Sequence, residues 1–200
     1  MCYRAVSLDL AAAFDTIDYQ VLVRRLEHTF GVKRSALSCA KSYLEGRSCF
    51  LKVGNAKSTT LRSDTNVPQG SVLGQLLFSL LTTPLGDVIS SFGVKCHEYA
   101  DDMQIYFAVN KDSLSKATLD LAGCTDAVYE WLLHNSLALN PDKSEVAMFG
   151  TAQRVGMLKQ SASVAVAGLQ IALSDHVKSR GMTFHSHLSF NKHINSMLFP

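Results

Sequence analysis

Two adjacent aspartates within an alternating stretch of apolar and polar residues constrain this chain more than any other feature. Asp101 and Asp102 follow one alternating run, residues 94–99, and precede another, residues 103–107. This pattern predicts a strand, a tight turn and a second strand. Two neighbouring acids repel each other and are poor strand formers, which favours a bound cation at the turn. The alternative is an ordinary solvated turn, because aspartate is a common turn residue.

A third acid lies in similar surroundings near the N-terminus. Asp9 lies near the end of a short apolar strand, residues 4–10, where a buried acid is costly unless it is paired or ligates a metal. One carboxylate from a strand and two from a hairpin are the donors that a two-metal site needs. In such sites two Mg²⁺ ions about 3.5–4 Å apart bind the attacking and leaving oxygens of a phosphoryl displacement. Local sequence does not establish that Asp9 and Asp101 meet.

Four segments of the chain resemble the palm motifs of reverse transcriptases, above all those of the non-LTR, LINE-like retrotransposon branch. They are residues 9–18, 67–74, 99–102 and 139–145, and their order and spacing also fit that family. The resemblance covers roughly residues 3–195. It implies an α+β fold, a polymerase palm with an antiparallel sheet backed by helices, with the fingers absent and the thumb incomplete.

The resemblance further implies one partial reverse transcriptase domain over residues 1–200. The palm would cover about residues 3–175, and a segment similar to the primer grip, with the start of a thumb, about residues 176–200. Because Met1 immediately precedes the strand of Asp9, we expect that fingers and thumb segments of a longer protein are missing.

The matching residues take metal-binding and catalytic roles from the resemblance. Asp9, Asp101 and Asp102 would be carboxylate ligands of two Mg²⁺ ions, with the Leu10 carbonyl as a further ligand. Lys143 matches the lysine proposed to protonate the pyrophosphate leaving group. Its alternative is a solvated loop lysine.

Three other residues match positions that contact the nucleotide and the template. Phe14 matches the steric gate that crowds a ribose 2′-OH, the group that distinguishes ribonucleotides from deoxynucleotides. Gln69 and Gly70 match the loop that lies along the template and the incoming nucleotide. A glycine also lets the backbone approach a ligand closely.

Together these matches imply an RNA-directed DNA polymerase of a retrotransposon, which transfers a deoxynucleotide to a primer 3′-OH. Its partners would be an RNA template, a DNA primer and deoxynucleotide triphosphates. Three residues depart from the family pattern: Gln75 replaces a usual proline, Arg180 an apolar residue and His185 an acid. The alternative is a catalytically inactive retroelement remnant, at most a weak nucleic-acid-binding protein.

Composition sets wider limits on the partners and the location. The net charge of +2 is low for a protein that binds nucleic acid by itself. Basic residues gather between residues 24 and 47, and because they interleave with apolar positions they favour a solvated helix face. The five cysteines lack Cys-x-x-Cys spacing, which is typical of a reduced intracellular protein of the nucleus or cytoplasm. The apolar run at residues 76–81 is short, so we expect no membrane span.

Periodicity and turn residues predict the remaining elements. Asp18 is expected to cap the first helix, and Pro84 to kink or break the third. The predicted helices cover residues 18–30, 34–44, 70–91 and 114–131, the hairpins residues 47–63 and 94–109, and the further strands residues 145–149, 163–167 and 169–173.

Overall fold

The computed structural model describes residues 2–68, 70–110, 113–158, 163–166, 168–179 and 181–198. The chain divides into two compact units. The sheet unit comprises Met1–Ala11, Pro84–Leu132 and Ala138–Pro200, and the helical unit comprises Ala12–Thr83 and Leu133–Leu137.

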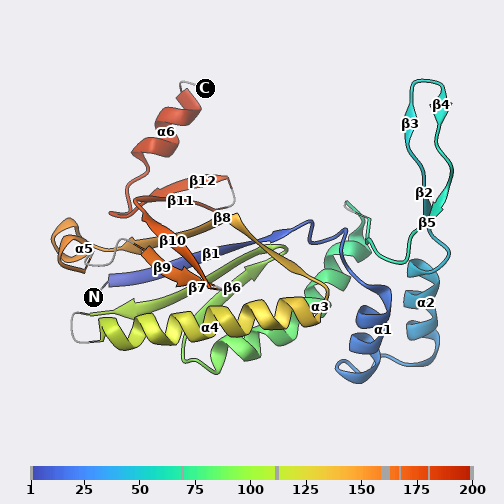
Figure 1. Cartoon of the computed structure of the whole chain (residues 1–200), viewed down its shortest axis with the longest axis horizontal. Coiled ribbons are helices and arrows are strands. Elements are labelled where there is room, and N and C mark those ends of the chain that lie inside the picture. Colours follow the sequence, from blue (N-terminus) through green and yellow to red (C-terminus); the bar gives the residue numbers. More distant parts are fainter. Residues whose placement is uncertain are drawn as a thin grey trace. The chain divides into compact units, whose positions relative to one another are not determined.

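The sheet unit is built on a six-stranded sheet (Figure 1). In order across the sheet, the strands are β6 (Lys95–Tyr99), β7 (Asp102–Val109), β1 (Cys2–Ala11), β8 (Ala138–Phe149), β10 (Leu169–Ser174) and β9 (Ser163–Val166). All neighbouring strands are antiparallel except β8 and β10. The predicted α+β architecture with an antiparallel sheet is confirmed, with one parallel pair added.

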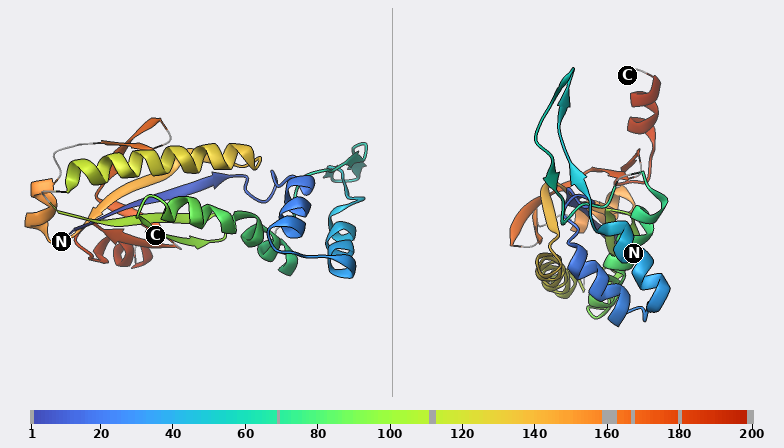
Figure 2. Two further views of the ribbon diagram at one scale, coloured as in Figure 1. Left: turned by 90° about the horizontal axis from the view of Figure 1, so that it is seen from below. Right: turned by 90° about the vertical axis from the view of Figure 1, so that its right-hand side faces the viewer.

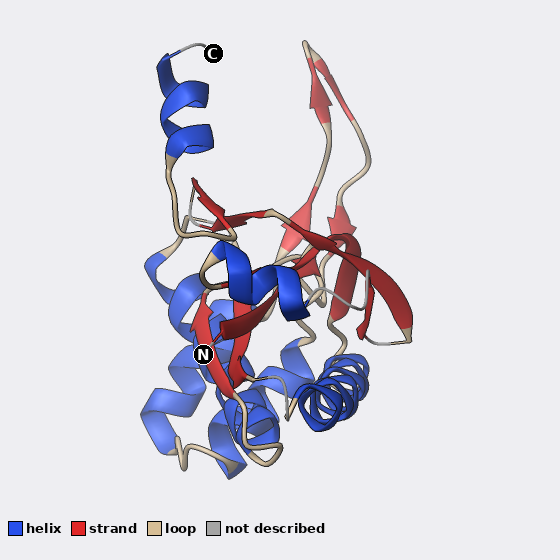
Figure 3. Ribbon diagram, turned by 90° about the vertical axis from the view of Figure 1, so that its left-hand side faces the viewer, coloured by secondary structure: helices blue, strands red, loops and turns tan. Residues whose placement is uncertain are grey.

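Helices cover one face of this sheet (Figures 2 and 3). α4 (Leu114–His134) and the C-terminal part of α3 (Val72–Ser90) lie on that face. Every second side chain of β1 is buried, namely Cys2, Arg4, Val6, Leu8 and Leu10. Because side chains alternate across a strand, Tyr3, Ala5, Ser7 and Asp9 point to the other face. We call that other face the open face.

The sequence predicts a kink or a break at Pro84, whereas α3 continues through this residue, so it does not break there. A proline removes one backbone hydrogen bond from a helix, but Leu81, Leu85 and Ile89 are fully buried, and their packing offsets that loss. By length and composition α3 is also the one described helix that could cross a membrane, which the short run at residues 76–81 did not indicate. The core helix of a folded protein passes the same test.

The helical unit places two helices beside a long hairpin. α1 (Tyr19–His28) is followed by α2 (Arg34–Leu44) and by the short strands β2 (Ser48–Cys49), β3 (Lys52–Val53), β4 (Ala56–Lys57) and β5 (Leu61–Arg62). The predicted cap is confirmed, since the Asp18 carboxylate accepts hydrogen bonds from the backbone N–H groups of Gln20 and Val21 at 2.7 and 3.0 Å. The predicted hairpin is also confirmed, because β3 pairs with β4 and β2 with β5.

The C-terminal part of the sheet unit adds two helices and a hairpin. They are α5 (Ala152–Leu158), β11 (His176–Ser179), β12 (Met182–His185) and α6 (Asn191–Leu198). α5 was not predicted. β8 begins at Ala138, seven residues before the predicted start of that strand near residue 145. The early start is important because it brings residues 138–140 beside the end of β1.

Candidate active site

The pairing of β1 with β7 sets Asp9 beside the acidic turn. Ser7 pairs with Gln104 and Leu8 with Met103, the last pair of this register. Asp9 directly follows Leu8 in β1, and Asp102 directly precedes Met103 in β7, so both aspartates adjoin the end of the paired strands. Because side chains alternate along each strand, Asp9 and Asp102 both belong to the open face. The sheet therefore joins two segments whose proximity local sequence could not establish.

Asp101 lies in the two-residue turn that connects β6 to β7. Tyr99 pairs with Asp102 across this turn. Ala100, the first turn residue, has a φ of 53°, in the left-handed region that alanine rarely adopts. The predicted tight turn is confirmed, and it keeps Asp101 half-buried next to Asp102.

A bulge in β8 directs Lys143 toward Asp9. Asn140 pairs with Asp9 and Glu145 with Ser7, so residues 141–144 oppose a single residue of β1. Extra residues of this kind bend a strand and redirect its side chains. The buried Ser144 hydroxyl donates to the Asn140 carbonyl at 2.8 Å and accepts from the Asp9 backbone N–H at 3.4 Å. The Lys143 ammonium (Nζ) then lies 4.0 Å from Asp9 Oδ2.

The carboxylates around the turn have the chemistry that a divalent cation requires. Magnesium prefers oxygen ligands, and the Asp9 side chain is 25% exposed, so it remains accessible to an ion. Among the described residues, however, no group of three or more His, Cys, Asp and Glu side chains converges on one metal position. In the part of the chain that the structure describes, the paired strands thus bring the segments of Asp9 and Asp102 together without assembling a three-carboxylate cluster.

The hairpin β11–β12 is attached to the open face by two hydrogen bonds that the sequence did not predict. The Gln104 amide donates to the Ser179 hydroxyl at 2.5 Å, and the Lys178 backbone N–H donates to Glu145 Oε2 at 3.0 Å. A cavity of about 280 Å³ lies between this hairpin and the sheet. In the sequence, the only signal for these contacts is the presence of polar residues at alternate positions of β7.

The face covered by helices holds a different polar group close to the acidic turn. Burial raises the pKa of Glu98, and the Cys96 thiol donates a long hydrogen bond of 3.9 Å to its carboxylate. Burial also raises the pKa of Cys124 on α4 to about 11. Glu98 pairs with Met103, whose side chain points to the helices, so this carboxylate does not belong to the open face.

The nucleotide-binding residues predicted from the motifs belong to the helical unit. The ring centroids of Phe14 and Phe78 lie 4.9 Å apart. The Phe14 backbone carbonyl accepts a hydrogen bond from the Val67 backbone N–H at 2.9 Å. Gly70 is exposed, with a φ of 78°. Gln69 lies outside the described residues, as does Arg180, one of the three departures from the family pattern.

The sheet, its acidic turn and the helices on one face define a polymerase palm-type domain. The solved structure of apo telomerase from Candida tropicalis, truncated from its C-terminal domain, matches with a TM-score of 0.60 at 13% identity. That match covers 94% of this chain and 35% of the telomerase chain. Telomerase from Candida albicans, in complex with a fragment of telomeric RNA, matches with a TM-score of 0.56 at 12% identity over 98% and 34% of the two chains. At these identities the likeness shows the fold alone.

The chain belongs to the reverse transcriptase (RNA-dependent DNA polymerase) family, whose model matches residues 2–184. The RNA-directed DNA polymerase from mobile element jockey of Drosophila melanogaster is 29% identical over 196 residues. The probable RNA-directed DNA polymerase from transposon X-element of the same species is 28% identical over 196 residues. Each alignment covers 95% of this chain and 20% of the relative. The chain thus spans about a fifth of the length of these curated relatives, and the predicted non-LTR retrotransposon family is confirmed.

Proposed function

We propose that this chain is the catalytic palm of an RNA-directed DNA polymerase of a non-LTR retrotransposon. The observation that carries the proposal is the strand register that pairs Leu8 with Met103, the neighbours of Asp9 and Asp102, with Asp101 in the adjoining turn. In the reaction, the 3′-OH of a DNA primer on an RNA template attacks the α-phosphate of a deoxynucleotide triphosphate. The bond to the β-phosphate breaks, and pyrophosphate leaves.

Two Mg²⁺ ions are the proposed cofactors. Asp9, Asp101 and Asp102, with the Leu10 carbonyl, would hold them. Bound ions of this kind stabilise the charge on the attacking and leaving oxygens. Asp101 and Asp102 are neighbours in the sequence, and adjacent acids repel each other in the absence of a cation. This repulsion supports a site that functions with metal bound.

Lys143 is proposed to donate a proton to the departing pyrophosphate. Its side chain is 71% exposed and lies at the limit of ion-pair distance from Asp9. An ion pair at this distance with a solvent-exposed lysine contributes at most about 1 kcal/mol, so the ammonium is free to turn toward a leaving group. The observation that supports this role is the β8 bulge, which directs Lys143 to the acidic end of the sheet.

The residues proposed for nucleotide selection are Phe14, Gln69 and Gly70. The contact of Phe14 with Phe78 holds the ring in place, and a fixed ring can exclude a ribose 2′-OH. Gly70 has no heavy atom within 4 Å of the position that a Cβ would take, so its backbone is accessible to a template or nucleotide. The assignment of Gln69 rests on the motif resemblance.

Primer extension on an RNA template with Mg²⁺ and the four deoxynucleotides tests this function. Asp101→Asn is expected to reduce extension to background, a loss of about a hundredfold or more, because preorganised charge stabilisation supplies most of the rate. Asp87→Asn is the matched control, since Asp87 is exposed on α3. A thermal melt in chelator should show that Asp101→Asn is as stable as the unaltered chain, whereas a large loss of stability would make Asp101 a structural residue.

The second candidate function is nucleic-acid binding without catalysis. The observation that favours it is that the described residues assemble fewer than three metal-ligating side chains at one position. The departures at Gln75 and His185 point in the same direction. If the unaltered chain binds a primer–template duplex and extends it no faster than Asp101→Asn, this second function replaces the first.

A further inference from the structure

The hairpin of the helical unit concentrates positive charge on an exposed surface. We call residues 47–63 the basic arm; its charged residues are Arg47, Lys52, Lys57 and Arg62, and it contains no acid. Because the whole chain has a net charge of +2, the arm's charge of +4 leaves the remainder at −2. Every residue from 48 to 62 is exposed, and the arm projects beyond α1 and α2 of its own unit (Figure 1). Core packing therefore does not explain this charge.

Two lysines of the arm oppose each other directly. Lys52 pairs with Lys57 across the hairpin, and like charges in directly opposite positions destabilise a strand pair. No described residue forms an ion pair with either lysine. Lys57 Nζ lies 3.7 Å from the centroid of the Phe50 ring, a contact that holds the ammonium at the surface without neutralising it. An anion bound at this pair would relieve the repulsion.

We infer that the basic arm binds the phosphate backbone of duplex DNA. Lysine and arginine side chains that neutralise phosphates release counterions, and this release supplies the sequence-independent part of DNA affinity. The choice of a nucleic acid among polyanions rests on the proposed function. The arm would hold a DNA duplex independently of metal ions and of the carboxylates in the sheet unit.

The shape of the arm favours DNA over an RNA duplex. The major groove of B-form DNA is about 12 Å wide and admits a two-stranded β-ribbon, whereas the major groove of an A-form RNA helix is too narrow for side chains to read. β3 and β4 form such a ribbon, and its tip is the small turn at Gly54 and Asn55. Gly54 has a φ of 57°, so this turn needs no side chain that would obstruct entry into a groove.

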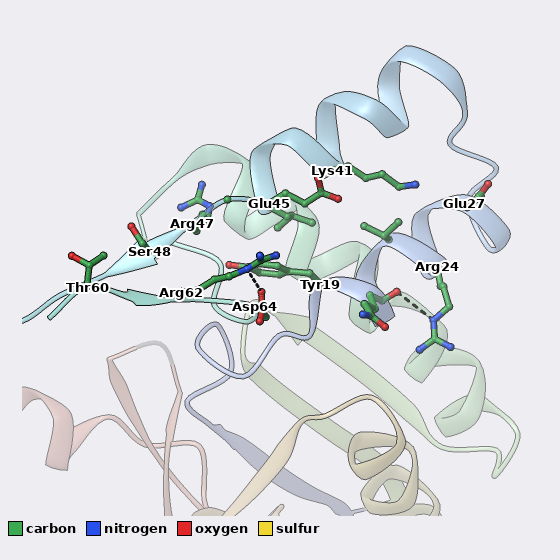
Figure 4. Close-up of a pocket in the computed structure, with 14 residues that line it drawn as sticks. Tyr19, Arg24, Glu27, Lys41, Glu45, Arg47, Ser48, Thr60, Arg62 and Asp64 are labelled. Carbon is green, nitrogen blue, oxygen red and sulfur yellow. Dashed lines mark hydrogen bonds and ion pairs between the residues drawn. The ribbon is translucent and has the colours of Figure 1, made fainter.

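The base of the arm has mixed charge and contributes less to binding. A hollow of about 1110 Å³ lies there. Figure 4 shows that basic residues line it together with acids such as Glu45. Arg62 forms an ion pair with Asp64 at 2.9 Å. Arg47 donates to the Tyr43 carbonyl at 2.8 Å, and its guanidinium lies over the Tyr43 ring. Because these two cations already have partners, the lysines nearer the tip are expected to dominate the affinity.

The test is a fluorescence anisotropy titration of the full chain with a labelled DNA duplex in chelator, repeated over a range of salt concentrations. Lys52→Gln combined with Lys57→Gln should weaken binding by about tenfold or more, and should reduce the slope of log K against log salt by about 2. Lys33→Gln combined with Lys116→Gln removes the same charge from two exposed lysines outside the arm. That control pair should leave the slope unchanged, and Lys52→Arg combined with Lys57→Arg should retain binding.

Three outcomes would overturn the inference. They are an equal loss of affinity in the control pair, an unchanged salt slope in the arm variant, and tighter binding to duplex RNA of the same sequence than to DNA. Circular dichroism melts verify that each variant is folded. Asp101→Asn should bind DNA as the unaltered chain does, so failure of the polymerase proposal and failure of the arm proposal give different results.

Discussion

Two hairpins of this chain hold like charges, and each is supported in a different way. The acidic hairpin, β6–β7, lies in the six-stranded sheet, where β7 also pairs with β1. The basic arm pairs only with itself. Both turn through two residues of which the first is left-handed, Ala100 with a φ of 53° and Gly54 with a φ of 57°. Glycine adopts this conformation freely, whereas alanine pays about 1–2 kcal/mol.

This difference shows what each hairpin depends on for its stability. Strain at Ala100 and repulsion between neighbouring acids persist in the acidic hairpin because the surrounding sheet and helices fix its backbone. The arm has no such support, so it relies on an unstrained glycine turn. A metal site needs carboxylates in a fixed geometry, whereas contact with a phosphate backbone needs exposed cations. The rigid support of the acidic hairpin therefore suits the proposed metal site, and the exposed position of the arm suits the proposed binding of phosphates.

The largest expected effect is the loss of unfolding free energy when a large apolar side chain in the acidic hairpin is truncated, compared with the same change in the arm. Ile105 in β7 is fully buried, so Ile105→Ala should lower the free energy of unfolding by about 2–5 kcal/mol. Leu61 in the arm is 64% exposed, so Leu61→Ala should change it by less than about 0.5 kcal/mol. Urea denaturation of both variants provides the measurement. If both variants lost a similar free energy of unfolding, the arm would be part of the core, and the two hairpins would not differ in their support.

A smaller effect is expected from exchanging the turn residues. Ala100→Gly should stabilise the chain by up to about 1 kcal/mol, since relief of left-handed strain exceeds the added entropy of the unfolded chain. Gly54→Ala introduces that strain into the arm, and because the arm is exposed it should leave the global melting temperature almost unchanged. Thermal melts measure the change in stability of Ala100→Gly and the change in melting temperature of Gly54→Ala. A destabilised Ala100→Gly would mean that the alanine methyl group makes a packing contact that outweighs the strain.

Local sequence predicted most of the elements that surround these hairpins. The cap at Asp18, the hairpin at residues 47–63 and the tight acidic turn follow from residue type and spacing, because these features depend on residues close together in the sequence. The family motifs supplied the palm fold, including the expectation that Asp9 would meet the acidic turn. The same cues did not predict the extent of β8, since Pro141 in the bulge indicates a loop when its long-range partner Asp9 is unknown.

The remaining errors also come from long-range packing. Pro84 is a strong local signal for a helix end, but three buried side chains around it keep α3 continuous. The sequence does not predict the arm as a separate basic surface, because Arg47 directly follows the basic residues of the two preceding helices. The arm is distinguished from the basic residues of α1 and α2 only by the pairing of β3 with β4, which sets Lys52 opposite Lys57. The register of a strand pair is a non-local property, and periodicity alone does not contain it.

The smallest expected effect tests whether the acidic hairpin alone responds to pH. Burial raises the pKa of Glu98 in the folded chain, while its Cys96 hydrogen bond acts more weakly in the opposite direction. A carboxyl group with a raised folded pKa binds protons more tightly when folded, so stability is present below the ordinary glutamate value of 4.5 and is lost as the pH rises through the folded pKa. Glu98→Gln should therefore be more stable than the unaltered chain at neutral pH, and the difference should shrink toward zero in acid.

Urea denaturation at several pH values measures this difference, with Glu45→Gln as the control at an exposed carboxylate for which no comparable burial exists. The control should show no pH-dependent gain. A gain of equal size in both variants would attribute the effect to net charge, and burial of Glu98 would then have no separate role. A gain confined to Glu98→Gln would show that the helix-covered side of the acidic hairpin disfavours negative charge because Glu98 is buried there.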